Sequence, residues 1–175
     1  LLLILTLGCV SHLEPRRWEP APGEPFSHDL LDRVQRAHVD AQGRVDYPGL
    51  LQDRAPLDAY YRALAAVSPK SHPSAFPTEA EQLAYWINLY NALTIDVVLT
   101  HFPVKSIRDI DISPGLFASG PWDKKLLAVE GVEVSLNDIE HRILRPIWRD
   151  ARIHYAVNCA ALSCPNLARD PFTAA

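Results

Sequence analysis

Residues 78–101 read TEAEQLAYWINLYNALTIDVVLTH, the longest stretch of the chain with helical periodicity. Apolar and weakly polar positions recur at the spacing of one helix face, at Leu83, Trp86, Ile87, Tyr90, Leu93, Thr94, Val97 and Val98. Thr78 and Glu81 have the spacing of a capping box, in which each side chain binds the backbone amide of the other residue. Pro103 follows the last apolar positions and is typical of a helix end. The pattern predicts one long helix that must pack against the rest of the domain.

Two shorter helices are predicted before this one. Ser27 can cap a helix whose apolar residues have helical spacing, and Gly43 ends that segment. Residues 44–48 are interpreted as a short extended piece and residues 56–67 as the second helix. Residues 68–77 are rich in proline and serine, which predicts a loop.

Strands are predicted only in the second half of the chain. Residues 126–129 and 132–134 are short apolar runs around Glu130 and Gly131, a pattern typical of a β-hairpin. Residues 153–158 alternate between apolar and polar side chains, so we interpret them as a further strand.

A last helix completes the predicted order of elements. Ser135 and Asp138 have the spacing of a helix cap, and the helix that they begin is predicted to stop before Pro146. The order is therefore helices, hairpin, helix and strand, without a regular series of βαβ units. This order predicts an α+β fold in which helices pack on a small antiparallel sheet, as a single domain over residues 27–175.

The composition excludes nucleic acid as an expected partner. Of the 175 residues, 48% are hydrophobic and 22% are charged, which is ordinary for a globular domain with one core. The formal net charge is −4, and the basic residues are scattered along the chain. Such a chain lacks the positive field that attracts polyanions.

The first nine residues have the pattern of an export signal. Residues 1–8 are apolar but too few to span a bilayer, as expected for the remnant of a signal peptide. Cys9 directly follows Gly8, as in bacterial lipoproteins, so we expect lipidation of Cys9 and a membrane partner through that anchor. The alternative is an ordinary signal peptide with an incidental cysteine. Residues 10–26 are proline-rich and predict a tether, and the expected location is the cell envelope, either periplasmic or as an outer-membrane lipoprotein.

Residues 152–165, RIHYAVNCAALSCP, concentrate the chemically active side chains. They hold His154, Cys159 and Cys164 within a short stretch. A nearby imidazole or a helix N-terminus lowers the pKa of a thiol and populates the reactive thiolate. In an oxidising compartment the same two cysteines can instead form a disulfide.

Four motifs in order resemble one known family, the domain-of-unknown-function family numbered 547. They are residues 84–92, 104–107, 136–145 and 154–165, and the resemblance extends from about Gly43 to the C-terminus. It implies a fold but no established reaction. Members that resemble this chain occur in bacterial secreted or lipid-anchored proteins and as C-terminal domains of plant proteins with coiled-coil segments. Relatives continue with a further helix after the position of residues 171–173, so we expect the domain to be incomplete at its C-terminus.

The resemblance also implies which residues matter. The family pattern falls on Asn88, Tyr90, Asn91, Glu140, His141, His154, Cys159 and the turn Ser163-Cys164-Pro165. In plant relatives the position of Cys164 can be serine, whereas that of Cys159 stays cysteine. The family pattern therefore favours Cys159 as the reactive thiol.

These residues are compatible with a cysteine-dependent hydrolase or acyl transferase. The candidate site consists of the nucleophile Cys159, the general base His154 or His141, and the orienting residue Asn88, Asn91 or Glu140. Such a site would follow papain-like chemistry with a permuted order of residues, because geometry and not sequence order defines a triad. We expect these residues to form a cleft for an unknown peptide or small-molecule substrate, without a cofactor.

A different class of function fits the same residues. Cys159 and Cys164 can form a disulfide, while Asn88 and Asn91 can tie their helix to neighbouring loops. The domain would then be a non-catalytic module that binds a peptide or a glycan. A metal site is the weakest alternative, because the spacing of the histidines and cysteines matches no zinc motif.

Overall fold

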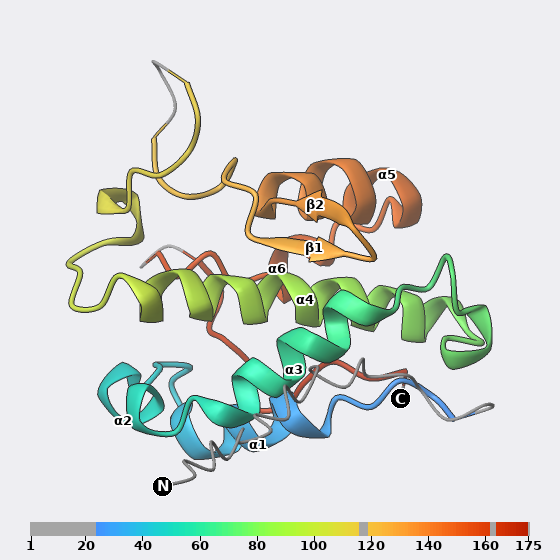
Figure 1. Cartoon of the computed structure of the whole chain (residues 1–175), viewed down its shortest axis with the longest axis horizontal. Coiled ribbons are helices and arrows are strands. Elements are labelled where there is room, and N and C mark those ends of the chain that lie inside the picture. The colour runs from blue at the N-terminus through green and yellow to red at the C-terminus, as the bar shows by residue number, and fades with distance from the viewer. Residues whose placement is uncertain (1–23, 116–118, 162–163, 175) are drawn as a thin grey trace, which may run out of the picture.

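The computed structural model describes residues 24–115, 119–161 and 164–174 (Figure 1). The expected signal remnant, Cys9 and most of the tether lie outside these residues. The elements are α1 (Asp29–His38), α2 (Tyr47–Gln52), α3 (Ala55–Ala66), η1 (Pro73–Ala75), α4 (Glu79–Thr100), η2 (Ile107–Asp109), β1 (Leu127–Val129), β2 (Val132–Val134), the π-helix η3 (Asp138–Leu144), α5 (Arg145–Trp148) and α6 (Ile153–Ala156). The predicted fold class is confirmed: the described residues form a single α+β domain with a small antiparallel sheet.

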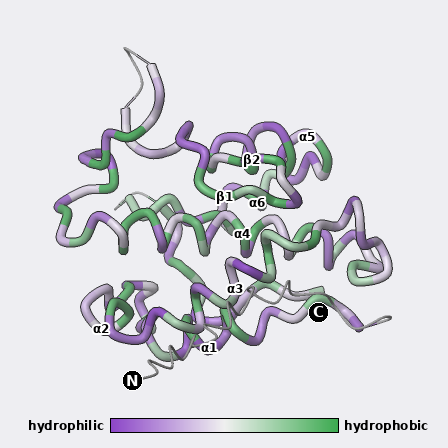
Figure 2. The backbone as a smooth tube through the Cα atoms, in the orientation of Figure 1, coloured by the Kyte–Doolittle hydropathy of each residue, from purple (hydrophilic) through white to green (hydrophobic). Residues whose placement is uncertain are grey.

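Helix α4 crosses the middle of the molecule, and its predicted capping box is present (Figure 1). The Thr78 hydroxyl accepts a hydrogen bond from the Glu81 amide at 3.2 Å, and the Glu81 carboxylate accepts one from the Thr78 amide at 2.8 Å. Hydrophobic residues recur along the whole helix (Figure 2), and nearly every residue from Ala84 to Leu99 is buried. A helix that is buried on all sides lies at the centre of a hydrophobic core, whereas a surface helix has one exposed face.

The other elements cover α4 from two sides. Helices α1, α2 and α3 lie along one side of it, and the hairpin with η3 and α5 lies along the other (Figure 1). Helix α1 packs on α2 and α3, η3 packs on α4, and α3 also reaches β1. One hydrophobic cluster joins the two sides and includes Leu31, Tyr60, Leu89, Leu136 and Ile139. Helix α4 is therefore the frame on which later segments of the chain are positioned.

The predicted hairpin is confirmed. Leu127 pairs with Val134 and Val129 pairs with Val132, so the turn consists of Glu130 and Gly131. Both turn residues have positive φ, 50° for Glu130 and 83° for Gly131. Two consecutive residues with positive φ give the turn that best follows the twist of paired strands.

The hairpin turn is fastened to the loop that precedes α4. The Glu130 carboxylate accepts hydrogen bonds from the hydroxyls of Ser68, at 2.7 Å, and Ser71. Its amide donates to the Ala65 carbonyl at 2.8 Å. Burial acts to raise the pKa of Glu130, but the two hydroxyls and the nearby His72 hold this pKa below its usual value.

The prediction of a strand over residues 153–158 is wrong. Residues Ile153–Ala156 form the short helix α6, and the chain becomes extended only at Val157. The Ile153 amide binds the Asp150 carbonyl at 3.2 Å, and the Val157 amide binds the Ile153 carbonyl at 3.1 Å. These local hydrogen bonds replace the ladder that a strand needs, and an alternation of six residues is too short to exclude a helical turn.

The helix that begins after Ser135 also differs from its prediction, because it does not stop before Pro146. Pro146 lies within α5, directly after the π-helix, so the chain stays helical although Pro146 has no amide hydrogen to donate. The preceding residue, Arg145, donates its amide to the carbonyl of Glu140, five residues back. This π-helical spacing continues the helix into α5, which ends at Trp148 and is followed by the C-cap Arg149 with φ 52°.

Residues 44–48 are extended only in part. Val45 forms an isolated antiparallel bridge with Val39, as expected for an extended piece. Helix α2, which was not predicted, begins two residues later at Tyr47. The Asp46 side chain accepts a hydrogen bond from the Gly49 amide at 3.1 Å, so this carboxylate caps the new helix.

Candidate functional site around the disulfide

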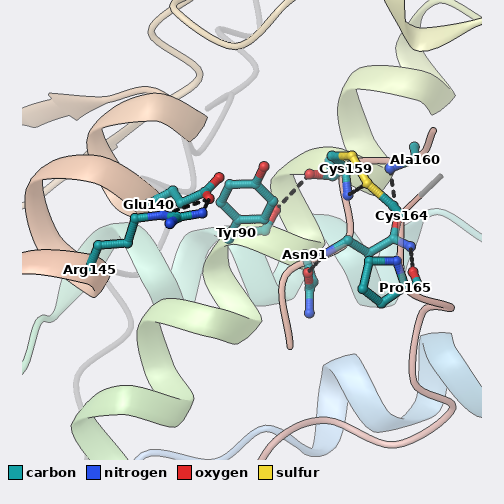
Figure 3. The surroundings of a disulfide bond; sticks show 10 residues. Tyr90, Asn91, Glu140, Arg145, Cys159, Ala160, Cys164 and Pro165 are labelled. Carbon is teal, nitrogen blue, oxygen red and sulfur yellow. Dashed lines mark hydrogen bonds and ion pairs between the residues drawn. A yellow bond between two sulfur atoms is a disulfide. The ribbon is translucent and has the colours of Figure 1, made fainter. Parts of the chain in front are cut away.

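Cys159 and Cys164 are joined by a disulfide bond (Figure 3). Both residues are partly exposed, and their Cα atoms are 6.0 Å apart. The Cys159 amide also donates a hydrogen bond to Cys164 Sγ at 3.3 Å. In this structure Cys159 holds no thiolate, so its role as a nucleophile stays a prediction for the reduced protein.

The side chain of Asn158 also connects the two ends of the loop between Cys159 and Cys164. Its Nδ2 donates to the Pro165 carbonyl at 2.6 Å, and its Oδ1 accepts from the Ala160 amide at 2.9 Å. Asn158 precedes one cysteine and Pro165 follows the other, so this amide holds both ends of the loop together. The prediction of site residues missed Asn158, although its place directly before Cys159 was the available signal.

Asn91 connects this loop to α4. Its side chain is 1% exposed, and its Nδ2 donates to the Ala156 carbonyl at 3.0 Å. Its Oδ1 accepts from the Asn158 amide at 2.8 Å. Both polar ends of the amide are therefore occupied by the backbone between α6 and the disulfide, which fixes where that segment lies.

Asn88, one turn earlier on α4, holds a different segment in the same way. Its side chain is fully buried, donates to the Phe172 carbonyl at 2.8 Å and accepts from the Phe172 amide at 2.9 Å. This two-point pairing resembles the bonding of a neighbouring strand. In the structure both asparagines connect α4 to the backbone of another segment. A role of either in orienting an imidazole stays a prediction.

Glu140 is part of a chain of polar contacts that ends at α4. The Arg145 guanidinium donates to one Glu140 oxygen from Nη2 at 2.6 Å and from Nε at 3.0 Å. Glu140 is also hydrogen-bonded to the Tyr90 hydroxyl, and Tyr90 is 1% exposed. Burial, followed by the charge of Glu140 and this hydrogen bond, raises the pKa of Tyr90. In the view of Figure 3, Tyr90 stands between the Glu140–Arg145 pair and the disulfide.

Asp138 fixes the helix that carries Glu140 and confirms the predicted cap. Its carboxylate accepts from the Ser135 amide at 2.9 Å and is paired with Lys125. Burial acts to raise the pKa of Asp138, but the bonds from Lys125 and Ser135 outweigh it and lower this pKa to about 2. The carboxylate is therefore ionised at neutral pH and anchors the start of η3.

The two candidate general bases lie on the surface. His141 is exposed on η3, and His154 is exposed on α6. The His154 ring contacts the ring of Tyr155 edge to face, with centroids 5.6 Å apart. Helix α4 packs on η3 and is tied to the segment after α6 by Asn91, whereas Asn88 is tied to Phe172. The cleft that these residues were expected to form stays a prediction.

An apolar groove lies beside α6. It has a volume of about 500 Å³ and is lined by residues of α4, α6 and the C-terminal segment, among them Leu83, Ile87, Tyr155 and Phe172. Arg152, paired with Asp150 at 2.7 Å, also lines it. The Tyr155 side chain is 73% exposed. A large aromatic side chain that is exposed beside an apolar groove is typical of a binding surface.

A smaller cavity reaches the disulfide. It has a volume of about 250 Å³, and Cys164, Asn158 and Ala161 line one wall. Residues of the turn after α1, including Gly43 and Arg44, also line it. Cys164 therefore borders an open space.

Within residues 24–115, 119–161 and 164–174, no group of three or more His, Cys, Asp or Glu side chains is placed to hold a metal ion. None of the helices described there has both the length and the apolarity to cross a membrane.

Comparison with known proteins gives one match. The model of the family described as "Protein of unknown function, DUF547" matches residues 74–175, which includes α4 and everything that packs on it from the C-terminal half. No curated protein and no solved structure matches the chain.

Proposed function

We propose that this domain binds an extended peptide in the groove beside α6. The chain belongs to the family DUF547, whose name states no function. The observation that carries the proposal is the exposure of Tyr155, 73%, at the wall of an apolar groove. Rigid aromatic side chains of this kind supply large contact areas at interfaces.

The chemistry of the groove favours a peptide over a glycan. Leu83, Ile87 and Phe172 give the groove an apolar lining, which suits an apolar peptide side chain better than a hydroxylated sugar. Arg152 and Asp150 add one charge of each sign, which can meet polar groups of a peptide backbone or terminus.

The chain itself supplies an example of the recognition that we propose. The segment around Phe172 is neither helix nor strand, and Asn88 binds both its amide and its carbonyl from α4. This segment is also one wall of the groove. Helix α4 therefore already holds the backbone of a segment without regular structure, and a bound peptide would lie beside it.

Substitution of Tyr155 tests the proposal. Peptides selected from a displayed random library on the purified protein are expected to bind Tyr155→Ala at least about tenfold more weakly than the native protein. Ile147→Ala is the matched control, because Ile147 is 62% exposed on α5 and does not line the groove. Calorimetric titration gives both dissociation constants. Selected peptides that bind Tyr155→Ala as tightly as the native protein would contradict the proposal.

A second candidate function is favoured by the cavity beside Cys164. After reduction, Cys159 could act as the nucleophile of a cysteine-dependent hydrolase or acyl transferase, with His141 or His154 as the base. Both candidate bases are exposed on the surface, His141 on η3 and His154 on α6.

Alkylation separates the two candidates. Iodoacetamide is expected to leave Cys159 and Cys164 unmodified until a reductant is added, because both sulfurs are bonded. If the thiol function is correct, reduced Cys159 then reacts near neutral pH at least about tenfold faster than Cys164, because a base lowers its pKa. Equal labelling of the two residues, read by peptide mass spectrometry, would count against a thiol enzyme.

We also propose export and a lipid anchor at Cys9. The disulfide supports export, because such bonds persist in oxidising compartments. The apolar residues 1–8 before Cys9 support a lipoprotein signal. Metabolic labelling of the expressed protein with a fatty-acid analogue is expected to mark the native chain and not Cys9→Ser; label on both would refute the anchor.

A further inference from the structure

We propose that Cys159–Cys164 is a site of reversible thiol–disulfide exchange with a Cys-x-x-Cys dithiol protein, and that the attack occurs at Cys164. The proposal goes beyond peptide binding and does not depend on it. Three observations carry it: the cavity beside Cys164, the amide that faces its sulfur, and the second closure of the loop by Asn158.

The cavity gives a nucleophile a path to Cys164. Cys164 lines the open space of about 250 Å³, together with Ala161, and both cysteines are partly exposed. Exchange requires an attacking thiolate to reach a sulfur of the disulfide, so access controls its rate. Disulfides enclosed in a core lack such access and are reduced only when the protein unfolds.

The hydrogen bond to Cys164 Sγ assists the second step of the exchange, in which Cys164 leaves as a thiolate. A thiolate of the dithiol protein attacks Cys164 Sγ, the Cys159–Cys164 bond breaks, and Cys159 leaves as a thiolate that takes a proton from water. The second thiolate of the dithiol protein then attacks its own sulfur in the mixed disulfide and releases Cys164. The Cys159 amide, which donates to this sulfur at 3.3 Å, stabilises the thiolate released. Two electrons pass to the domain, and the dithiol protein becomes a disulfide.

Asn158 makes the exchange reversible. Its two hydrogen bonds, to the Pro165 carbonyl and from the Ala160 amide, hold the two ends of the loop without the sulfurs. Asn91 fixes Asn158 to α4 through the Asn158 amide. After reduction, the two thiols therefore stay close, and the return reaction has little chain entropy to overcome.

Reduction of the folded protein is the first test. With dithiothreitol, and then with thioredoxin as the dithiol protein, two thiols per chain are expected to appear at a rate that does not change in urea below the unfolding transition. The midpoint of thermal unfolding is expected to fall by less than about 3 °C on reduction. Reduction that appears only in urea concentrations where the protein unfolds would overturn the proposal, as would reactivity toward dithiothreitol without any toward thioredoxin.

Filling the cavity is the second test. Ala161→Phe is expected to slow reduction by dithiothreitol at least about tenfold, because the new ring occupies the approach to Cys164. Ala151→Phe is the matched control, since Ala151 is exposed and does not line the cavity. Equal rates for the two variants would overturn the attack at Cys164. The urea series on the native protein tests the exchange itself even if Ala161→Phe does not fold.

Discussion

Replacement of Asn91 by leucine is expected to lower the free energy of unfolding by about 3 kcal/mol. Leucine has a similar volume but no polar atoms, so the Ala156 carbonyl and the Asn158 amide each lose their partner. An unpaired buried backbone group costs roughly 1–3 kcal/mol, and this substitution leaves two such groups. Urea unfolding followed by circular dichroism measures the change.

Thr94→Val is the matched control for this substitution. Thr94 lies nearly one turn from Asn91 on the same helix and is 2% exposed. Its hydroxyl donates to the Tyr90 carbonyl at 3.0 Å, within α4 itself. Removing this hydroxyl leaves Tyr90 in its helical hydrogen bond, so the expected loss is below about 1 kcal/mol. Equal losses for the two variants would mean that Asn91 acts as ordinary core and not as a connection to α6.

Hydrogen exchange gives a second readout for Asn91. In the native protein the Asn158 amide is bonded to a buried acceptor and is expected to exchange slowly. In Asn91→Leu this amide should exchange at least about tenfold faster, while amides in the middle of α3 keep their protection. Faster exchange throughout the domain would indicate general destabilisation in place of a local release.

Elements defined by local rules could be predicted from the sequence. The capping box of Thr78 and Glu81 and the turn at Glu130 and Gly131 need only neighbouring residues, and both occur as predicted. Helix α4 was predicted because its apolar residues repeat over many turns, which a chance pattern rarely does.

Elements defined by distant contacts could not be predicted in the same way. The segment after α6 is held by Asn91, more than sixty residues earlier in the chain, and no local spacing encodes that contact. The alternation of residues 153–158 was therefore interpreted as a strand although the segment begins as a helix. Helix α2 was missed because it is six residues long and depends on one cap, Asp46.

The candidate site shows the same division. Two of the four motifs, residues 84–92 and 154–165, include the buried amide of Asn91 and the bonded cysteines, because residue types alone mark buried amides and paired cysteines. Their roles depend on partners, and the sequence left the tying and catalytic roles of Asn88 and Asn91 both open. Two features, the contact of Asn158 with Pro165 and the exposure of Tyr155, required the fold.

Replacement of Gly43 by alanine is expected to lower the free energy of unfolding by about 3 kcal/mol, the second large effect. Gly43 has φ 74°, and a Cβ placed on it would lie 2.7 Å from both Asn166 Cβ and the Leu167 nitrogen. The turn after α1 therefore packs directly on the segment that follows Cys164. Because the Leu167 contact is with backbone, it cannot be relieved by a rotamer change, and either the turn or the segment must shift.

Gly131→Ala separates the two causes of this loss. Gly131 has a similar φ, 83°, but a Cβ there would meet no atom within 4 Å. Its replacement tests backbone strain alone, for which we expect about 1 kcal/mol. The difference between the two variants, measured by urea unfolding, is then the contribution of close packing between residue 43 and residues 166–167.

If both variants lose the same free energy of unfolding, backbone strain explains the whole loss, and the segment after the disulfide is not held by this contact. If Gly43→Ala loses more, the wall of the cavity beside Cys164 is a rigid part of the core, because Gly43 and Cys164 line the same space.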